Sequence, residues 1–161
     1  MATKDEIVAG IAEVEQRLER MLPGILQNLD RALLEGEWSV HDALCHMADD
    51  VPATPRWVRT VEAAINNTPR PTAPNLGDIN QQGVDARKGK PIEEVVQEIR
   101  DGLHGDAAEI PGLDEALLAH EIPARSGDLQ PASERLKFYA VGHNHMHLDE
   151  IEKAIAANTA T

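Results

Sequence analysis

Near the carboxyl end of the chain stands the run Val141-Gly-His-Asn-His-Met-His-Leu-Asp-Glu-Ile151. Apolar residues on either side of its histidines recur at spacings of three and four, which predicts a helix over residues 131–158. Two of the histidines, His143 and His147, stand four residues apart, so on a helix their side chains lie above one another on one face. At roughly 100° per residue, His147 falls inside the apolar stripe and His143 at its flank.

The other polar residues of this run take different positions on the predicted helix. His145 falls on the far side, where we expect solvent or an interface, whereas Asn144 falls inside the stripe, where a buried amide needs hydrogen-bond partners. For His143 and His147 the periodicity leaves two interpretations open. They are core histidines hydrogen-bonded to their neighbours, or two ligands of one metal ion, since helical bundles build metal sites from facing helices.

Three earlier segments show the same helical periodicity. The first starts with the capping-box pattern Thr3-x-x-Glu6 and keeps its apolar stripe as far as Leu29. The second starts at Ser39, a favourable helix N-cap, and is expected to continue, disturbed by two prolines, to about residue 66. The third has Pro91 in its first turn, where proline is well tolerated.

The segments between the long helices are expected to be loops or short helices. They are a long crossover loop or linker at residues 68–77, short helices within residues 78–88 and 113–120, and a loop at residues 121–130. Four long amphipathic helices and no β-pattern predict an all-α protein, an antiparallel four-helix bundle with one long crossover connection. We expect a single domain over residues 1–161, with an aliphatic core because aromatic residues are few.

The composition narrows the classes of partner. The chain has a formal net charge of −13, which repels polyanions, so we expect no binding to nucleic acid or to anionic membrane surfaces. The first residues lack the pattern of a signal peptide, and no stretch of about 18 apolar residues could span a bilayer. The single cysteine, Cys45, fits a reducing compartment. We therefore expect a soluble cytoplasmic protein, and a homodimer if an apolar face remains uncovered.

A third candidate ligand, His46, lies about a hundred residues before the other two. On the wheel of its own helix it is away from the centre of the apolar stripe and close to Asp49 and Asp50. Periodicity alone therefore favours a surface histidine paired with acids, although as a ligand it could use one of those acids to orient its ring. The neighbouring Cys45 is expected to be a small core residue, and Ser39 with Asp42 to cap the helix.

Taken together, the two histidine segments resemble the signatures of the DinB/YfiT-like superfamily of metalloenzymes. Trp38-Ser39-Val40-x-Asp42-x-Leu44-x-His46-Met47 resembles the helix-2 signature of that family, and His143-x-x-x-His147-Leu148-Asp149-Glu150-Ile151 resembles its helix-4 signature. The family includes the N-terminal domain of mycothiol-dependent maleylpyruvate isomerase and the bacillithiol transferases. Residues 80–96 are similar to its Asn-bearing segment and third helix, so the resemblance spans most of the chain.

The resemblance implies one divalent metal ion held by His46, His143 and His147, with zinc or nickel expected first and iron also compatible. It implies a metal-dependent enzyme of thiol-transferase or hydrolase type that acts on a small-molecule substrate, and it raises a low-molecular-weight thiol as a candidate cofactor. The acid-rich composition offers few basic residues to bind an anionic thiol. Asp49, Asp50 and Asn144 are candidate pocket residues, while catalytic and substrate-binding residues stay unassigned.

Two further hypotheses remain beside the enzyme. One is a non-catalytic bundle that binds a metal or a ligand and serves in sequestration or interaction. The other is a metal-free bundle whose histidines belong to the core. Metal content separates the last hypothesis from the other two, and turnover separates the enzyme from the binding module.

Overall fold

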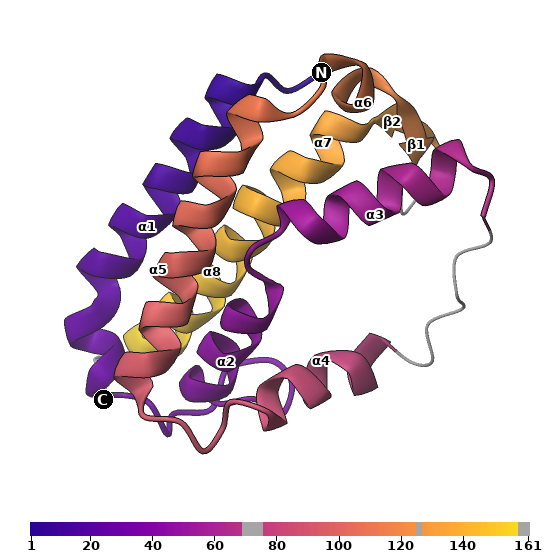
Figure 1. The fold of residues 1–161 in the computed structure, drawn as a ribbon. Coiled ribbons are helices and arrows are strands. Elements are labelled where there is room, and N and C mark those ends of the chain that lie inside the picture. Colours follow the sequence, from indigo (N-terminus) through magenta and orange to yellow (C-terminus); the bar gives the residue numbers. More distant parts are fainter. Residues whose placement is uncertain (69–75, 125–126, 158–161) are drawn as a thin grey trace.

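The computed structural model describes residues 1–68, 76–124 and 127–157 and confirms an all-α bundle (Figure 1). The four helices of the bundle are α1 (Lys4–Leu26), α2 (Val40–Asp50), α5 (Ile92–Glu109) and α8 (His143–Ala156). The smaller elements are α3 (Thr54–Ile65), α4 (Leu76–Asp85), a 3₁₀ turn (Ile110–Gly112), α6 (Glu115–Ala119), β1 (Glu121–Pro123), β2 (Leu129–Pro131), α7 (Ala132–Lys137) and a π-helical segment (Phe138–Gly142). Among the described residues, no helix is both long and apolar enough to cross a membrane.

The four long helices form two antiparallel pairs, α1 with α5 and α2 with α8 (Figure 1). Within the bundle, α1 runs beside the π-helical segment and α8 in the same direction, as shown by Gly10, which faces Val141, and, further along, Gly24, which faces Ile155. A Cβ atom added to Gly10 would lie 2.9 Å from both methyl groups of Val141, so this glycine permits the close approach of the two helices.

A long crossover joins α2 to α5. The predicted helix from Ser39 to about Asn66 is two helices in the structure, because α2 ends at Asp50 and α3 starts in a new direction at Thr54 (Figure 1). The buried carboxylate of Asp106 on α5 accepts hydrogen bonds from the backbone N–H groups of Ala53 (2.7 Å) and Thr54 (2.8 Å). These bonds satisfy the first N–H groups of α3 and fix where it leaves the bundle. Most of the linker expected at residues 68–77 lies outside the described residues.

Three further expectations are corrected. The loop expected at residues 121–130 contains the short strands β1 and β2, which pair antiparallel with Ile122 opposite Gln130 and the Ile122 side chain fully buried. Strands of three residues are too short to give a visible alternation. The helix expected over residues 131–158 is divided into α7, the π-helical segment and α8. The first helix ends at Leu26, before Leu29, although its capping box is confirmed.

The core is aliphatic, as expected, with the addition of Trp57, whose indole N–H donates to the carbonyl of Ala132 over 2.7 Å. The helix α2 is covered on several sides, by α4, α5 and α8. Almost all of its residues are therefore buried, and they are Val40, Asp42, Ala43, Leu44, Cys45, His46, Met47, Ala48 and Asp50.

Candidate metal centre

Three imidazoles meet between α2 and α8. The helix α2 contributes His46, and the first turns of α8 contribute His143 and His147. One ring nitrogen from each histidine lies within 4.8 Å of the other two, and no other group of three or more potential metal-ligating side chains of this kind occurs among the described residues. His46 and His147 are buried, whereas the side chain of His143 keeps 18% of its surface exposed. The cluster therefore has one side that solvent reaches.

Two carboxylates determine which nitrogens of the α8 histidines carry a proton. The Nδ1 atom of His147 lies 2.8 Å from Oε2 of Glu150, and Nδ1 of His143 lies 2.9 Å from Oδ2 of Asp50. A carboxylate only accepts hydrogen bonds, so each Nδ1 is the donor and each neutral ring keeps its lone pair on Nε2. These two Nε2 atoms lie 3.2 Å apart. Two lone pairs at this distance repel each other unless a proton or a cation lies between them.

The third ring also has an unused lone pair. The Nε2 atom of His46 lies 3.5 Å from Oδ2 of Asp50, and its buried Nδ1 has no hydrogen-bond partner in the described part of the chain. The ring packs against Trp38, with centroids 4.9 Å apart, and the indole N–H of Trp38 donates to Oε1 of Gln81 on α4 over 2.9 Å. A buried nitrogen without a partner is costly, so the His46 ring is not explained as an ordinary core residue.

Burial keeps His46 and His147 in the neutral form that binds metals. Loss of solvent lowers the pKa of His46 to about 4, although the charge of Asp50 opposes this shift. Burial, together with the nearby His143, lowers the pKa of His147 as well. For Asp50, burial alone would raise the pKa, but the hydrogen bond from His143 and the charge of Arg56 outweigh it, and the net shift is downward. Near neutral pH the centre thus combines the neutral imidazoles of His46 and His147 with the ionised carboxylate of Asp50.

The position of His46 corrects the helical-wheel interpretation. That interpretation favoured a surface residue, but His46 is 2% exposed. The wheel assumes that a helix is covered on one face, whereas α4 and α8 both pack against α2. Of the acids beside it, Asp50 contacts the cluster, while Asp49 pairs with Arg87 at 2.6 Å.

The remaining candidates take simpler roles. Asn144 is buried and donates from Nδ2 to the carbonyl of Ala140 over 3.0 Å, but no side-chain hydrogen bond joins it to the histidines in the described part of the chain. His145 is half-buried, so it is less exposed than expected. Cys45 is fully buried, and burial raises the pKa of its thiol to about 11, which agrees with a core residue. Ser39 and Asp42 form the expected N-terminal cap as a reciprocal capping box.

Two residues of the centre are absent from the sequence predictions. The spacing of three between His147 and Glu150 is a helical contact and could have identified Glu150. No sequence signal indicates Arg56, because it reaches Asp50 only through the turn between α2 and α3.

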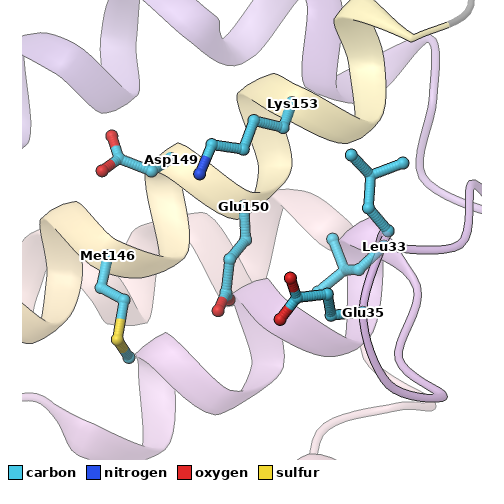
Figure 2. Close-up of a pocket in the computed structure, with 7 residues that line it drawn as sticks. Leu33, Glu35, Met146, Asp149, Glu150 and Lys153 are labelled. Atoms are coloured by element: carbon cyan, nitrogen blue, oxygen red, sulfur yellow. The ribbon is translucent and has the colours of Figure 1, made fainter.

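A pocket of about 190 Å³ lies beside the cluster, between α8 and the segment that follows α1 (Figure 2). Its walls are formed by Leu33, Leu34, Glu35, Met146, Asp149, Glu150 and Lys153. Because Glu150 also holds His147, this carboxylate connects the pocket with the ligand set from the Nδ1 side of the ring.

Comparison with solved structures identifies the bundle. No protein-family model matches the chain, and no curated protein matches it in sequence. The structure of YfiT from Bacillus subtilis is similar over 98% of this chain and 87% of that one, with a TM-score of 0.68 and 16% sequence identity. The chain has the YfiT fold. YfiT is described as a probable metal-dependent hydrolase with an unusual four-helix bundle topology. In the present chain, this fold includes the parallel arrangement of α1 and α8 described above.

Proposed function

We propose that the chain is a metal-dependent enzyme in which His46, His143 and His147 hold one divalent ion. The observation that carries this proposal is the pair of facing Nε2 lone pairs at 3.2 Å. Two nitrogens bound to one tetrahedral zinc ion at about 2.0–2.1 Å would be separated by roughly 3.3–3.4 Å, so the two rings already have a suitable spacing. One ring nitrogen of His46 lies within 4.8 Å of the donor atoms of the other two histidines and supplies a third donor.

The surrounding carboxylates support a catalytic centre. When bound, a divalent ion held by three imidazoles supplies Lewis acidity and lowers the pKa of water. Asp50 orients His143 and contacts His46, and Glu150 orients His147, as the partners of metal-binding histidines usually do. The partial exposure of His143 leaves that side open to a small molecule, which favours an enzyme over a closed structural site.

The reaction proposed first is hydrolysis of a small-molecule substrate, because YfiT is described as a probable metal-dependent hydrolase and has the same fold. Transfer of a low-molecular-weight thiol is the second candidate reaction. Imidazole ligands suit zinc, nickel and iron, and we propose zinc or nickel. A non-catalytic binding bundle is the alternative, and the absence of turnover with a filled site would favour it.

Metal analysis tests the ligand set. Protein purified without an affinity tag should contain about one divalent ion per chain, and His147→Ala should remove it, because that ring lies inside the cluster. His145→Ala is the matched control, since it removes an imidazole from the same helix but outside the cluster, and should leave the metal content unchanged. Equal metal content in parent and His147→Ala protein would refute the assignment.

The assembly and location expected from composition remain proposals. We propose that the chain forms one domain, pairs as a homodimer and works in the cytoplasm. Exposed apolar side chains such as Leu26, Leu34 and Met146 support self-association, because each is more than 40% exposed. Light scattering that gives the mass of one chain across micromolar concentrations would refute the dimer.

A further inference from the structure

Arg56, on α3, is connected to the candidate metal centre through a single carboxylate. Its Nη1 atom lies 2.5 Å from Oδ1 of Asp50, while the other oxygen of Asp50 lies 2.9 Å from Nδ1 of His143. A guanidinium group, a carboxylate and a metal-binding imidazole therefore follow one another in a row. Because the side chain of His143 is partly exposed, this row lies on the side of the cluster that a small molecule can reach.

Most of the donor capacity of Arg56 is unused. A guanidinium has five N–H donors, and only Nη1 of Arg56 makes a hydrogen bond or ion pair among the described residues. Arg56 binds Asp50 through Nη1 alone, so the ion pair is monodentate rather than bidentate. The side chain is 38% exposed, so the Nη2 side of the group remains free to bind a second anion.

The guanidinium is held in a fixed position by an aromatic ring. The Cζ atom of Arg56 lies 4.6 Å from the ring centroid of Tyr139, and the hydroxyl of Tyr139 accepts a hydrogen bond from Arg135 over 3.2 Å. Stacking of this kind fixes the plane of a guanidinium and reduces the entropy lost when it binds a planar anion. Arg56 is therefore preorganised to recognise a carboxylate.

The charges around the cluster favour an anionic ligand once a metal is bound. The two carboxylates that orient the histidines, Asp50 and Glu150, are offset in part by the guanidinium group of Arg56, which pairs with Asp50. A divalent ion would then give this region a positive charge within a chain whose formal net charge is −13. Such a local reversal attracts small anions to the centre while the rest of the surface repels them.

The edge of the site next to His143 is apolar. Phe138, in the π-helical segment, is 48% exposed, and its ring centroid lies 5.8 Å from that of His143. A short carbon chain that reaches from the metal towards Arg56 could pack against this ring.

We propose that Arg56 is a specificity-determining residue that binds a carboxylate of the substrate, while the reacting group of the same molecule lies at the metal. The substrate class is thus a small organic acid that bears a second, metal-binding polar group. This inference rests on the proposed metal-dependent function and narrows its substrate.

Two small metal-binding probes test the proposal. One is the monohydroxamate of succinic acid, whose hydroxamate binds the metal and whose carboxylate stays free, and the other is its neutral analogue with a carboxamide in place of the carboxylate. Affinities for the zinc-loaded protein are measured by titration calorimetry at low ionic strength. The carboxylate probe should bind at least about tenfold more tightly than the neutral probe, since a charge-assisted hydrogen bond is added.

Variants of Arg56 separate recognition of the probe carboxylate from structural support of the metal centre. In Arg56→Gln the ratio of the two affinities should fall to near one, and in Arg56→Lys, which keeps the charge but loses the planar group, part of the ratio should remain. Arg59→Gln is the matched control, because it removes an exposed arginine from the same helix, and should keep the full ratio. Circular dichroism and zinc content show that each variant is folded and loaded.

Three results would overturn the inference. If the two probes bind the parent equally, the site does not recognise the carboxylate, although the metal centre still stands. If Arg56→Gln keeps the ratio, Arg56 does not recognise the carboxylate, and an equal weakening of both probes would show that Arg56 only supports Asp50. If neither probe binds the zinc-loaded parent better than His147→Ala, the proposed metal function itself is wrong, and the inference falls with it.

Discussion

The two antiparallel helix pairs of the bundle are built from different chemistry. Between α1 and α5 the buried residues are almost all aliphatic, including Ile11, Leu18 and Leu103, and ion pairs such as Glu19 with Arg100 lie at the surface. Between α2 and α8 the interface buries His46 and His147 beside Asp50 and Asn144. Because buried polar groups cost free energy unless they are satisfied, the first pair contributes stability and the second pair uses some of it to form a site.

The largest expected effect of a single substitution is in the aliphatic pair. Leu18→Ala should lower the free energy of unfolding by about 2–5 kcal/mol, because it leaves a cavity in a fully buried position. Denaturant unfolding measures the loss. The folded variant should still contain one metal ion per chain. If Leu18→Ala lost the metal and kept its stability, the division of stability to the α1–α5 pair and metal binding to the α2–α8 pair would be wrong.

The second expected effect is in the polar pair and depends on metal. His46→Leu should leave the stability of the metal-free protein equal or higher, since it removes a buried nitrogen that lacks a partner. With zinc at a hundred times its dissociation constant, the parent should gain about 2.7 kcal/mol and the variant nothing. Thermal unfolding with and without zinc measures both quantities.

The matched control for this prediction is His104→Leu, which changes an exposed histidine on α5. It should keep the full stabilisation by zinc, because His104 lies outside the cluster. If His46→Leu destabilised the metal-free protein as strongly as Leu18→Ala, the polar pair would be a stabilising interface and the comparison would fail.

The smallest expected effect is at the surface of the aliphatic pair. Glu19→Gln removes the partner of Arg100, but the pair is solvent-exposed, so the loss should be less than about 1 kcal/mol and should shrink further at high salt. Chemical unfolding at two salt concentrations measures it. A loss of the size expected for Leu18→Ala would show that ion pairs, rather than aliphatic packing, hold α1 to α5.

The features that could be predicted from the sequence are those that depend on neighbours three or four residues away. The capping boxes at Thr3 and Ser39 and the amphipathic stripes of the long helices are of this kind, and they are present in the structure. The spacing of His143 and His147 is another, and it placed His147 inside the apolar stripe and His143 at its flank without any knowledge of what lay opposite. The sequence alone therefore determined four long amphipathic helices and two of the three clustered imidazoles, and the third followed only from the family resemblance.

The features of the fold and of the site that the sequence did not predict depend on contacts between distant segments. The burial of His46 depends on α4 and α8 both covering α2, which a single helical wheel cannot represent. The separation of α3 from α2 likewise depends on Asp106 of α5, which binds the backbone at the start of α3. Arg56 reaches Asp50 only because α3 leaves the bundle beside it. Periodicity reports burial averaged along one helix, whereas a site is made where several helices meet, so only the tertiary structure could bring its charged residues together.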